Sequence, residues 1–120
     1  MAVKKSVVAS FRKAFESYLP PEDLTVSQWA ERYRILSSES SAEAGPWRNA
    51  RTPYMVEPMD AITDPRVRHI TVVASSQVGK SELELNAIGY IIDQDPGSIL
   101  YIQPNLDDAK KFSRLRIAPM

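Results

Sequence analysis

One stretch of the sequence has the residue types and spacing of a loop that binds the phosphates of a nucleotide. It consists of Ala74-Ser75-Ser76-Gln77-Val78-Gly79-Lys80-Ser81. The closing Gly-Lys-Ser matches the phosphate-loop pattern, whereas Ala74 stands where that pattern has its first glycine. In such a loop, successive backbone amides and the positive end of the following helix attract an anion. We therefore predict that residues 75–81 bind nucleotide phosphates.

The last three residues of this loop have roles that follow from their chemistry. Lys80 is the predicted catalytic residue, because its ammonium group would contact the β- and γ-phosphate oxygens. The Ser81 hydroxyl is the predicted Mg²⁺ ligand, and Gly79 removes a side chain where the backbone must approach a phosphate. ATP and Mg²⁺ are accordingly the expected cofactors. Since alanine has less freedom in φ than glycine, Ala74 predicts a slightly different start of the loop.

Tyr54 lies upstream of the loop, between Pro53 and Pro58. Its ring can stack on adenine, because aromatic faces suit stacking on a base. It can equally pack the preceding segment onto a sheet. Both roles agree with the sequence, so Tyr54 is a candidate cofactor-binding residue.

A phosphate-loop ATPase also needs an acidic side chain at the end of an apolar strand, close to the Mg²⁺ ion. Asp93 follows two isoleucines, but it lies inside the helix that the loop itself begins, so we predict a structural role. Residues 98–103 end in Gln103 and offer no carboxylate. We therefore expect the chain to be the N-terminal part of a longer ATPase, and to be inactive alone.

The spacing of apolar residues predicts the helices and strands around the loop. Residues 69–74 are rich in β-branched side chains and predict a buried strand, and residues 81–92 fit a helix. Residues 98–103 predict a second strand, and Asn105 caps a last helix. This order predicts an α/β fold: an N-terminal helical segment, then the first βαβα part of a RecA-like P-loop NTPase sheet, incomplete in this chain. The two strands would be parallel with a right-handed crossover.

The N-terminal half is predicted to be helical and then irregular. Residues 6–19 gather an apolar stripe on one helix face, namely Val8, Phe11, Phe15 and Tyr18. Thr25 and Gln28 form a capping-box pattern that begins a second helix. Residues 37–53 are polar and small, and a short helix with Pro58 in its first turn follows. We divide the chain into a helical segment suited to docking (residues 1–36), a linker (37–53) and the start of an ATPase domain (54–120).

Composition excludes several classes of protein. Of the 120 residues, 43% are hydrophobic and 25% are charged, which is typical of a globular chain. There is no cysteine, so disulfides, zinc knuckles and thiol nucleophiles are excluded, and no apolar run approaches the roughly 20 residues that span a membrane. The formal net charge is zero. Contact with DNA would need a local basic patch, and one candidate is the run of Lys110, Lys111, Arg114 and Arg116, which can also be a solvated helix face.

Several separated motifs, in order, resemble the large terminase subunit of lambda-type tailed phages, the GpA-like family. The resemblance covers about residues 25–120. The motifs are Trp29-Ala30-Glu31-Arg32, Gly45-Pro46-Trp47, Arg51-Thr52-Pro53-Tyr54, Gln77-Val78-Gly79-Lys80-Ser81-Glu82, Gln103-Pro104 and Arg116-Ile117-Ala118-Pro119-Met120.

This resemblance implies an enzyme of two parts: an ATPase that translocates DNA into a procapsid, and a C-terminal endonuclease absent from these residues. It implies as partners double-stranded DNA, the portal of the procapsid and the small terminase subunit, which would contact residues 1–36. It also implies an oligomer in the cytoplasm of the bacterial host. Two alternatives stay open on the residues alone: another P-loop NTPase of helicase-like type, and a non-catalytic protein-docking fragment.

Overall fold

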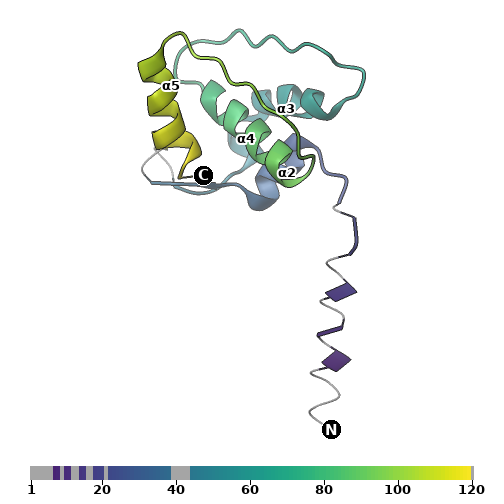
Figure 1. Cartoon of the computed structure of the whole chain (residues 1–120). Helices are drawn as coiled ribbons and strands as arrows, with labels where there is room; N and C mark the ends of the chain where they lie inside the picture. The colour runs from purple at the N-terminus through teal and green to yellow at the C-terminus, as the bar shows by residue number, and fades with distance from the viewer. Residues whose placement is uncertain are drawn as a thin grey trace.

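A computed structural model describes residues 7–8, 10–11, 14–15, 18–20, 22–38 and 44–119 (Figure 1). Its elements are, in order, α2 (Val26–Tyr33), β1 (Ile35–Leu36), β2 (Gly45–Pro46), the 3₁₀ turns η1 (Asn49–Arg51) and η2 (Pro53–Met55), α3 (Val56–Thr63), α4 (Lys80–Asp93), α5 (Leu106–Phe112) and the π-helical turn η3 (Ser113–Ile117). None of the described helices is long and apolar enough to cross a membrane.

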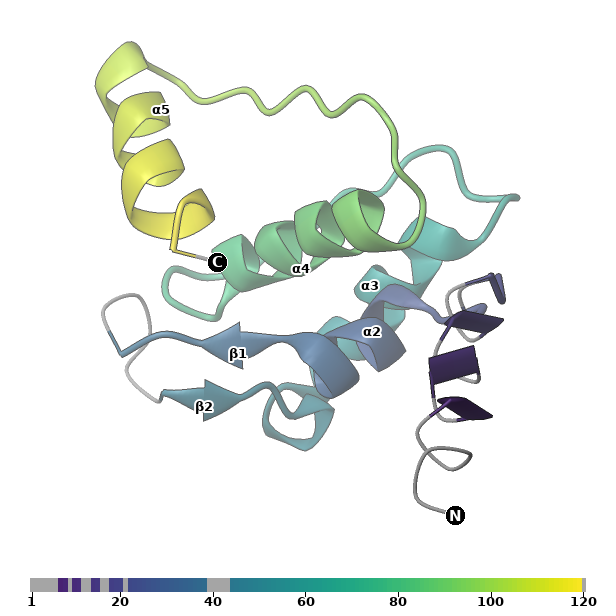
Figure 2. The ribbon, with the colours of Figure 1, turned by 60° about the horizontal axis from the view of Figure 1, so that its bottom comes forward.

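The core lies where α2 packs against α3 and α4, with the hairpin β1–β2 to one side (Figure 2). Its buried members are Val26, Trp29, Ala30, Trp47, Met55, Met59 and Leu83. Because these side chains come from α2, from the segment before α3, from α3 and from α4, one core fixes the direction of α4. The core thereby also positions Lys80, because Lys80 is the first residue of α4.

Both predicted helix caps are confirmed. At α2, Gln28 donates its backbone N–H to Thr25 Oγ1 over 3.4 Å, and the backbone N–H of Thr25 donates to Gln28 Oε1 over 3.0 Å. At α5, Asp108 donates its backbone N–H to Asn105 Oδ1 over 2.8 Å. Each cap satisfies amide groups that the first helical turn leaves without a partner.

The predicted short helix with Pro58 in its first turn is confirmed as α3, and its Met59 is fully buried. The described part of the predicted linker contains structure. β1 and β2 pair antiparallel, with Ile35 opposite Pro46, and Trp47 donates its backbone N–H to Arg34 over 2.9 Å. Trp47 is buried, so this segment contributes to the core. The domain boundaries after residues 36 and 53 stay predictions.

The two predicted parallel strands, residues 69–74 and 98–103, are not strands in the structure. Both segments pass α4 as extended chain, and the one sheet among the described residues is the hairpin β1–β2. Val73 is 92% exposed and Leu100 is 84% exposed, so the expected burial is also absent. The composition of a segment indicates which surroundings suit it, whereas a strand needs a hydrogen-bonded neighbour. No such neighbour lies beside either segment in the described part of the chain.

Six described residues within the predicted helix 6–19 are helical, namely Val7, Val8, Ser10, Phe11, Ala14 and Phe15. Tyr18 and Leu19 form a turn and a bend, so the helix does not extend to residue 19 as predicted. The other residues of that prediction lie outside the described ones. The chain projects from the body of the molecule here (Figure 1). The members of the apolar stripe, Val8, Phe11, Phe15 and Tyr18, are all exposed.

Candidate nucleotide-binding site

The loop at residues 75–79 joins an extended segment to α4 and turns through left-handed backbone conformations. Gln77 has a φ of 60° and Gly79 a φ of 89°, and Gln77 is the one non-glycine residue of the described chain with a positive φ. Ala74 is outside this set, so alanine has no backbone penalty at that position. The turn is made by Gln77 and Gly79, which explains how the loop forms without its first glycine.

The positive φ of Gly79 favours glycine, and the space around this residue is also tight. A Cβ atom at this position would lie 3.2 Å from Met55 Cε, and Met55 is a core residue. The sequence predicted that Gly79 leaves room for a phosphate; the structure adds that a methionine side chain lies where a Cβ would project. As the N-cap of α4, Gly79 accepts hydrogen bonds from the amides of Glu82 and Leu83 over 2.9 and 3.2 Å.

Lys80 is the first residue of α4, and its side chain reaches back across the loop. Its Nζ donates to the backbone oxygen of Ala74 over 3.1 Å and to that of Ser75. The ammonium group is thereby held over the start of the loop. Ser81 follows in the first helical turn and is exposed.

Two hollows flank the loop. The first, which we name the Tyr54 cleft, has a volume of about 390 Å³ and is lined by residues that include Trp47, Thr52, Tyr54, Gln77, Val78 and Gly79. The second, the Lys80 cleft, has a volume of about 440 Å³ and is lined by residues that include Lys80, Ser81, Glu84, Tyr101, Lys111 and Arg116. The predicted site residues of the loop's second half are thus divided between two adjacent hollows.

Tyr54 comes to the loop from η2. Its hydroxyl donates to the backbone oxygen of Val78 over 3.1 Å, while 59% of the residue stays exposed. The structure therefore brings Tyr54 to the phosphate loop, as the prediction of a shared site requires. The hydrogen bond fixes one end of the ring and leaves much of the residue open to solvent.

Glu82, one residue beyond Ser81, is held by one arginine that precedes α4 in the chain and one that follows it. Arg34 Nη2 lies 3.2 Å from Glu82 Oε2, and Arg116 Nη1 lies 3.1 Å from Glu82 Oε1. The Arg34 side chain is only 4% exposed. Its burial lowers the pKa of the guanidinium, and the charge and hydrogen bond of Glu82 oppose that effect. The pairs connect the first turn of α4 to the end of α2 and to η3.

Tyr101 closes one side of the Lys80 cleft. Its hydroxyl donates to Glu84 over 2.6 Å and accepts from Gln103 Nε2 over 2.6 Å, and its ring stacks on Phe112 with centroids 4.5 Å apart. Burial, with the hydrogen bond and charge of Glu84, raises the pKa of Tyr101 to about 12. The hydroxyl therefore stays protonated at neutral pH and holds Glu84 in place.

Comparison with known proteins identifies the family. Residues 41–120 match the family of the phage terminase large subunit gpA, ATPase domain. The chain belongs to this family. Over 103 residues it is 28% identical to the terminase large subunit of Enterobacteria phage P21, a match that covers 86% of this chain and 16% of that protein. No solved structure matches. The predicted relation to the GpA-like terminases is confirmed.

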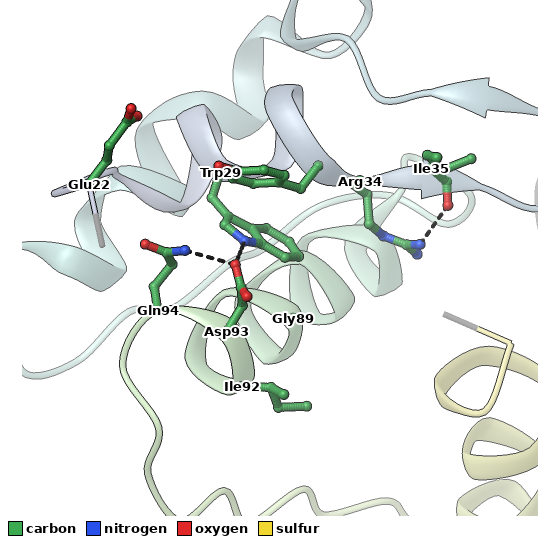
Figure 3. A pocket seen from close by; sticks show the side chains of 9 residues that line it. Glu22, Trp29, Arg34, Ile35, Gly89, Ile92, Asp93 and Gln94 are labelled. Atoms are coloured by element: carbon green, nitrogen blue, oxygen red, sulfur yellow. Dashed lines mark hydrogen bonds between the residues drawn. The ribbon is translucent and has the colours of Figure 1, made fainter. Parts of the chain in front are cut away.

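In this terminase chain, Asp93 has the structural role that its position predicted. It lies at the end of the 14-residue helix α4, about 20 Å from the loop at 1.5 Å per residue. There Trp29 Nε1 and Gln94 Nε2 donate to Asp93 Oδ2 over 2.8 and 2.7 Å, beside a hollow of about 520 Å³ (Figure 3). These two hydrogen bonds, that of Gln94 first, lower the pKa of Asp93. No group of three or more potential metal-ligating side chains occurs among the described residues.

The pairing of Glu82 with Arg34 and Arg116 was not predicted from the sequence. The partners lie 48 and 34 positions away from Glu82, so no local spacing signals the contact. Arg116 was assigned instead to a basic run that faces either DNA or solvent. Its contact with Glu82 turns it toward the phosphate loop.

Proposed function

We propose that this chain forms the nucleotide-binding part of a phage terminase large subunit, and that it binds ATP and Mg²⁺ through residues 75–81. One observation carries the proposal: Lys80 and Ser81 line the same cleft at the N-terminus of α4, with the Lys80 ammonium held over the loop. A helix N-terminus beside a lysine favours a phosphate anion. Membership of the terminase ATPase family supports ATP as the nucleotide.

The residues of the loop suit the parts of the nucleotide as follows. Lys80 exchanges the backbone oxygens of Ala74 and Ser75 for the β- and γ-phosphate oxygens, because a charged acceptor forms the stronger hydrogen bond. Ser75, Ser76, Gln77, Val78 and Gly79 provide backbone amides. The Ser81 hydroxyl is a suitable Mg²⁺ ligand, since that ion keeps several waters and needs few protein ligands beside phosphate oxygens. Mg²⁺ would neutralise charge on the phosphates.

Tyr54 is proposed to stack on the adenine in the Tyr54 cleft. The exposed residue and the hydrogen bond from its hydroxyl to Val78 support this role, because the ring is both fixed and open to a ligand. The test is equilibrium binding of ATP with Mg²⁺ to the full-length protein. Tyr54→Ala should weaken binding about tenfold, since base stacking contributes about 1–3 kcal/mol, whereas Tyr54→Phe should retain most of the affinity. Equal affinity of Tyr54→Ala and wild type would leave Tyr54 a packing role only.

For the full-length protein we propose the packaging cycle of a terminase. ATP hydrolysis would drive double-stranded DNA through the portal into a procapsid in the host cytoplasm, by an oligomer whose subunits also carry an endonuclease. Residues 1–36 would contact the small terminase subunit, and their exposed apolar stripe supports a docking role. In the full-length protein, the extended segments 69–74 and 98–103 would pair with further strands. We expect no ATP turnover by the 120-residue chain alone.

A further inference from the structure

The basic run on α5 and η3 is divided between two faces of the molecule. Lys111 and Arg116 line the Lys80 cleft, whereas Lys110 and Arg114 are exposed outside it. Neighbouring residues of an α-helix point about 100° apart, which separates Lys111 from Lys110. The cleft therefore has one lysine from each of two helices, namely Lys80 from α4 and Lys111 from α5.

Contacts on both sides of the cleft fix the position of Lys111. Phe112, the next residue in the chain, stacks on Tyr101 with ring centroids 4.5 Å apart and planes 15° apart. The Tyr101 hydroxyl in turn donates to Glu84 of α4 over 2.6 Å. Through these contacts α5 lies beside the first turns of α4, so the backbone of Lys111 is held at the wall of the cleft.

The charges in the cleft suit an anion. The Lys111 ammonium forms no ion pair within the described part of the chain, and Lys80 Nζ bonds only to neutral backbone oxygens there. The carboxylates of the cleft, Glu84 and Asp108, each accept a hydrogen bond from a different side chain. Two ammonium groups without a carboxylate partner thus line one hollow, and such a concentration of one sign of charge attracts the opposite sign.

We propose that Lys111 contacts the terminal phosphate of ATP and distinguishes ATP from ADP. The inference rests on the proposed function of the loop. Residues 75–79 do not line the Lys80 cleft, so the part of the nucleotide that enters it is the end of the phosphate chain beside Lys80 and Ser81. A lysine carries a compact charge on a flexible stem, which lets Lys111 reach this end from α5. ADP lacks the terminal phosphate and leaves Lys111 in solvent.

The test compares the affinities of the full-length protein for ADP and for the β,γ-imido analogue of ATP, both with Mg²⁺. Lys111→Gln should weaken binding of the ATP analogue about tenfold, the size expected for a hydrogen bond to a charged group, and should change ADP binding less than about twofold. The matched control is Lys110→Gln, because it removes the same charge from the adjacent exposed position. It should change neither affinity by more than about twofold.

Lys111→Arg keeps the charge and should retain the affinity for the ATP analogue within about threefold. ADP binding reports that each variant is folded. Equal losses for both nucleotides, an equal loss in Lys110→Gln, or no loss in Lys111→Gln would overturn the inference while leaving the loop as the nucleotide site. A wild-type protein that binds neither nucleotide would overturn the proposed function and this inference together.

Discussion

Gly89 is the position at which the packing of α2 on α4 can be tested most sharply. A Cβ atom there would lie 2.3 Å from Trp29 Cη2 and 3.0 Å from Cζ3. Neither side can yield easily, because the indole is buried in the core and its Nε1 donates to Asp93 over 2.8 Å. We predict that Gly89→Ala displaces the indole and destabilises the chain.

The expected size follows from three effects. Overpacking a core costs about 1–3 kcal/mol, and loss of the indole hydrogen bond costs about 1 kcal/mol. Alanine is a better helix former than glycine by about 1 kcal/mol, which offsets part of this. We expect a net loss of about 2 kcal/mol in the free energy of unfolding, or roughly 10 °C in Tm for a domain of this size.

The assay is urea unfolding of wild type, Gly89→Ala and the control Gly97→Ala, followed by far-ultraviolet circular dichroism. A Cβ at Gly97 would meet its nearest atom at 3.7 Å, so this control should stay within about 0.5 kcal/mol of wild type. In a Trp29→Phe background the cost of Gly89→Ala should shrink, because a phenyl ring lacks the outer indole atoms. A Gly89→Ala protein as stable as wild type would refute the packing described for α2 and α4.

Three further perturbations follow, two from contacts in the structure and one from the proposed docking role of residues 1–36. The pKa of Tyr101 is raised from 10.0 to about 12, so the protonated hydroxyl contributes fully to stability below about pH 10, and this contribution is lost as the pH rises through 12. Tyrosinate absorbance follows the titration, and the free energy of unfolding on either side of this pH range measures the loss. Tyr101→Phe should abolish the pH-dependent change. Glu82→Gln leaves Arg34 buried without a carboxylate and should cost about 3 kcal/mol in the free energy of unfolding. Replacing both Phe11 and Phe15 with serine should weaken binding of the small subunit in a pull-down and spare ATPase activity; joint loss of thermal stability and ATPase activity would place the stripe in the chain's own core.

Local chemistry explains which parts of the fold could be predicted. The capping box at Thr25 and the cap at Asn105 depend on residues three positions apart, so their signal is present in the sequence alone. Helix α4 was predicted from residue 81 to 92 and extends one residue further at each end. The strands could not be predicted reliably, because pairing depends on a neighbour that the apolar pattern of residues 69–74 does not specify.

The candidate site likewise has features that the sequence predicted and features that it did not. The Gly79-Lys80-Ser81 pattern located the loop, but Gln77, not Ala74, proved to adopt the unusual backbone conformation. Tyr54 was predicted as a candidate cofactor-binding residue, but its hydrogen bond to Val78 was not. The pairing of Glu82 depends on the three-dimensional path of the chain, and no residue spacing indicates it.

The central claim is that the loop ending in Lys80 is the site of ATP hydrolysis, and the rate of ATP turnover by full-length Lys80→Ala protein tests it most directly. The side chain reaches across a surface loop, and alanine suits the first position of a helix, so circular dichroism should show an intact fold. Lys110→Ala is the matched control, since Lys110 is exposed on α5. We expect ATP turnover to disappear in Lys80→Ala and to persist in Lys110→Ala. A wild-type rate in Lys80→Ala would contradict the central claim.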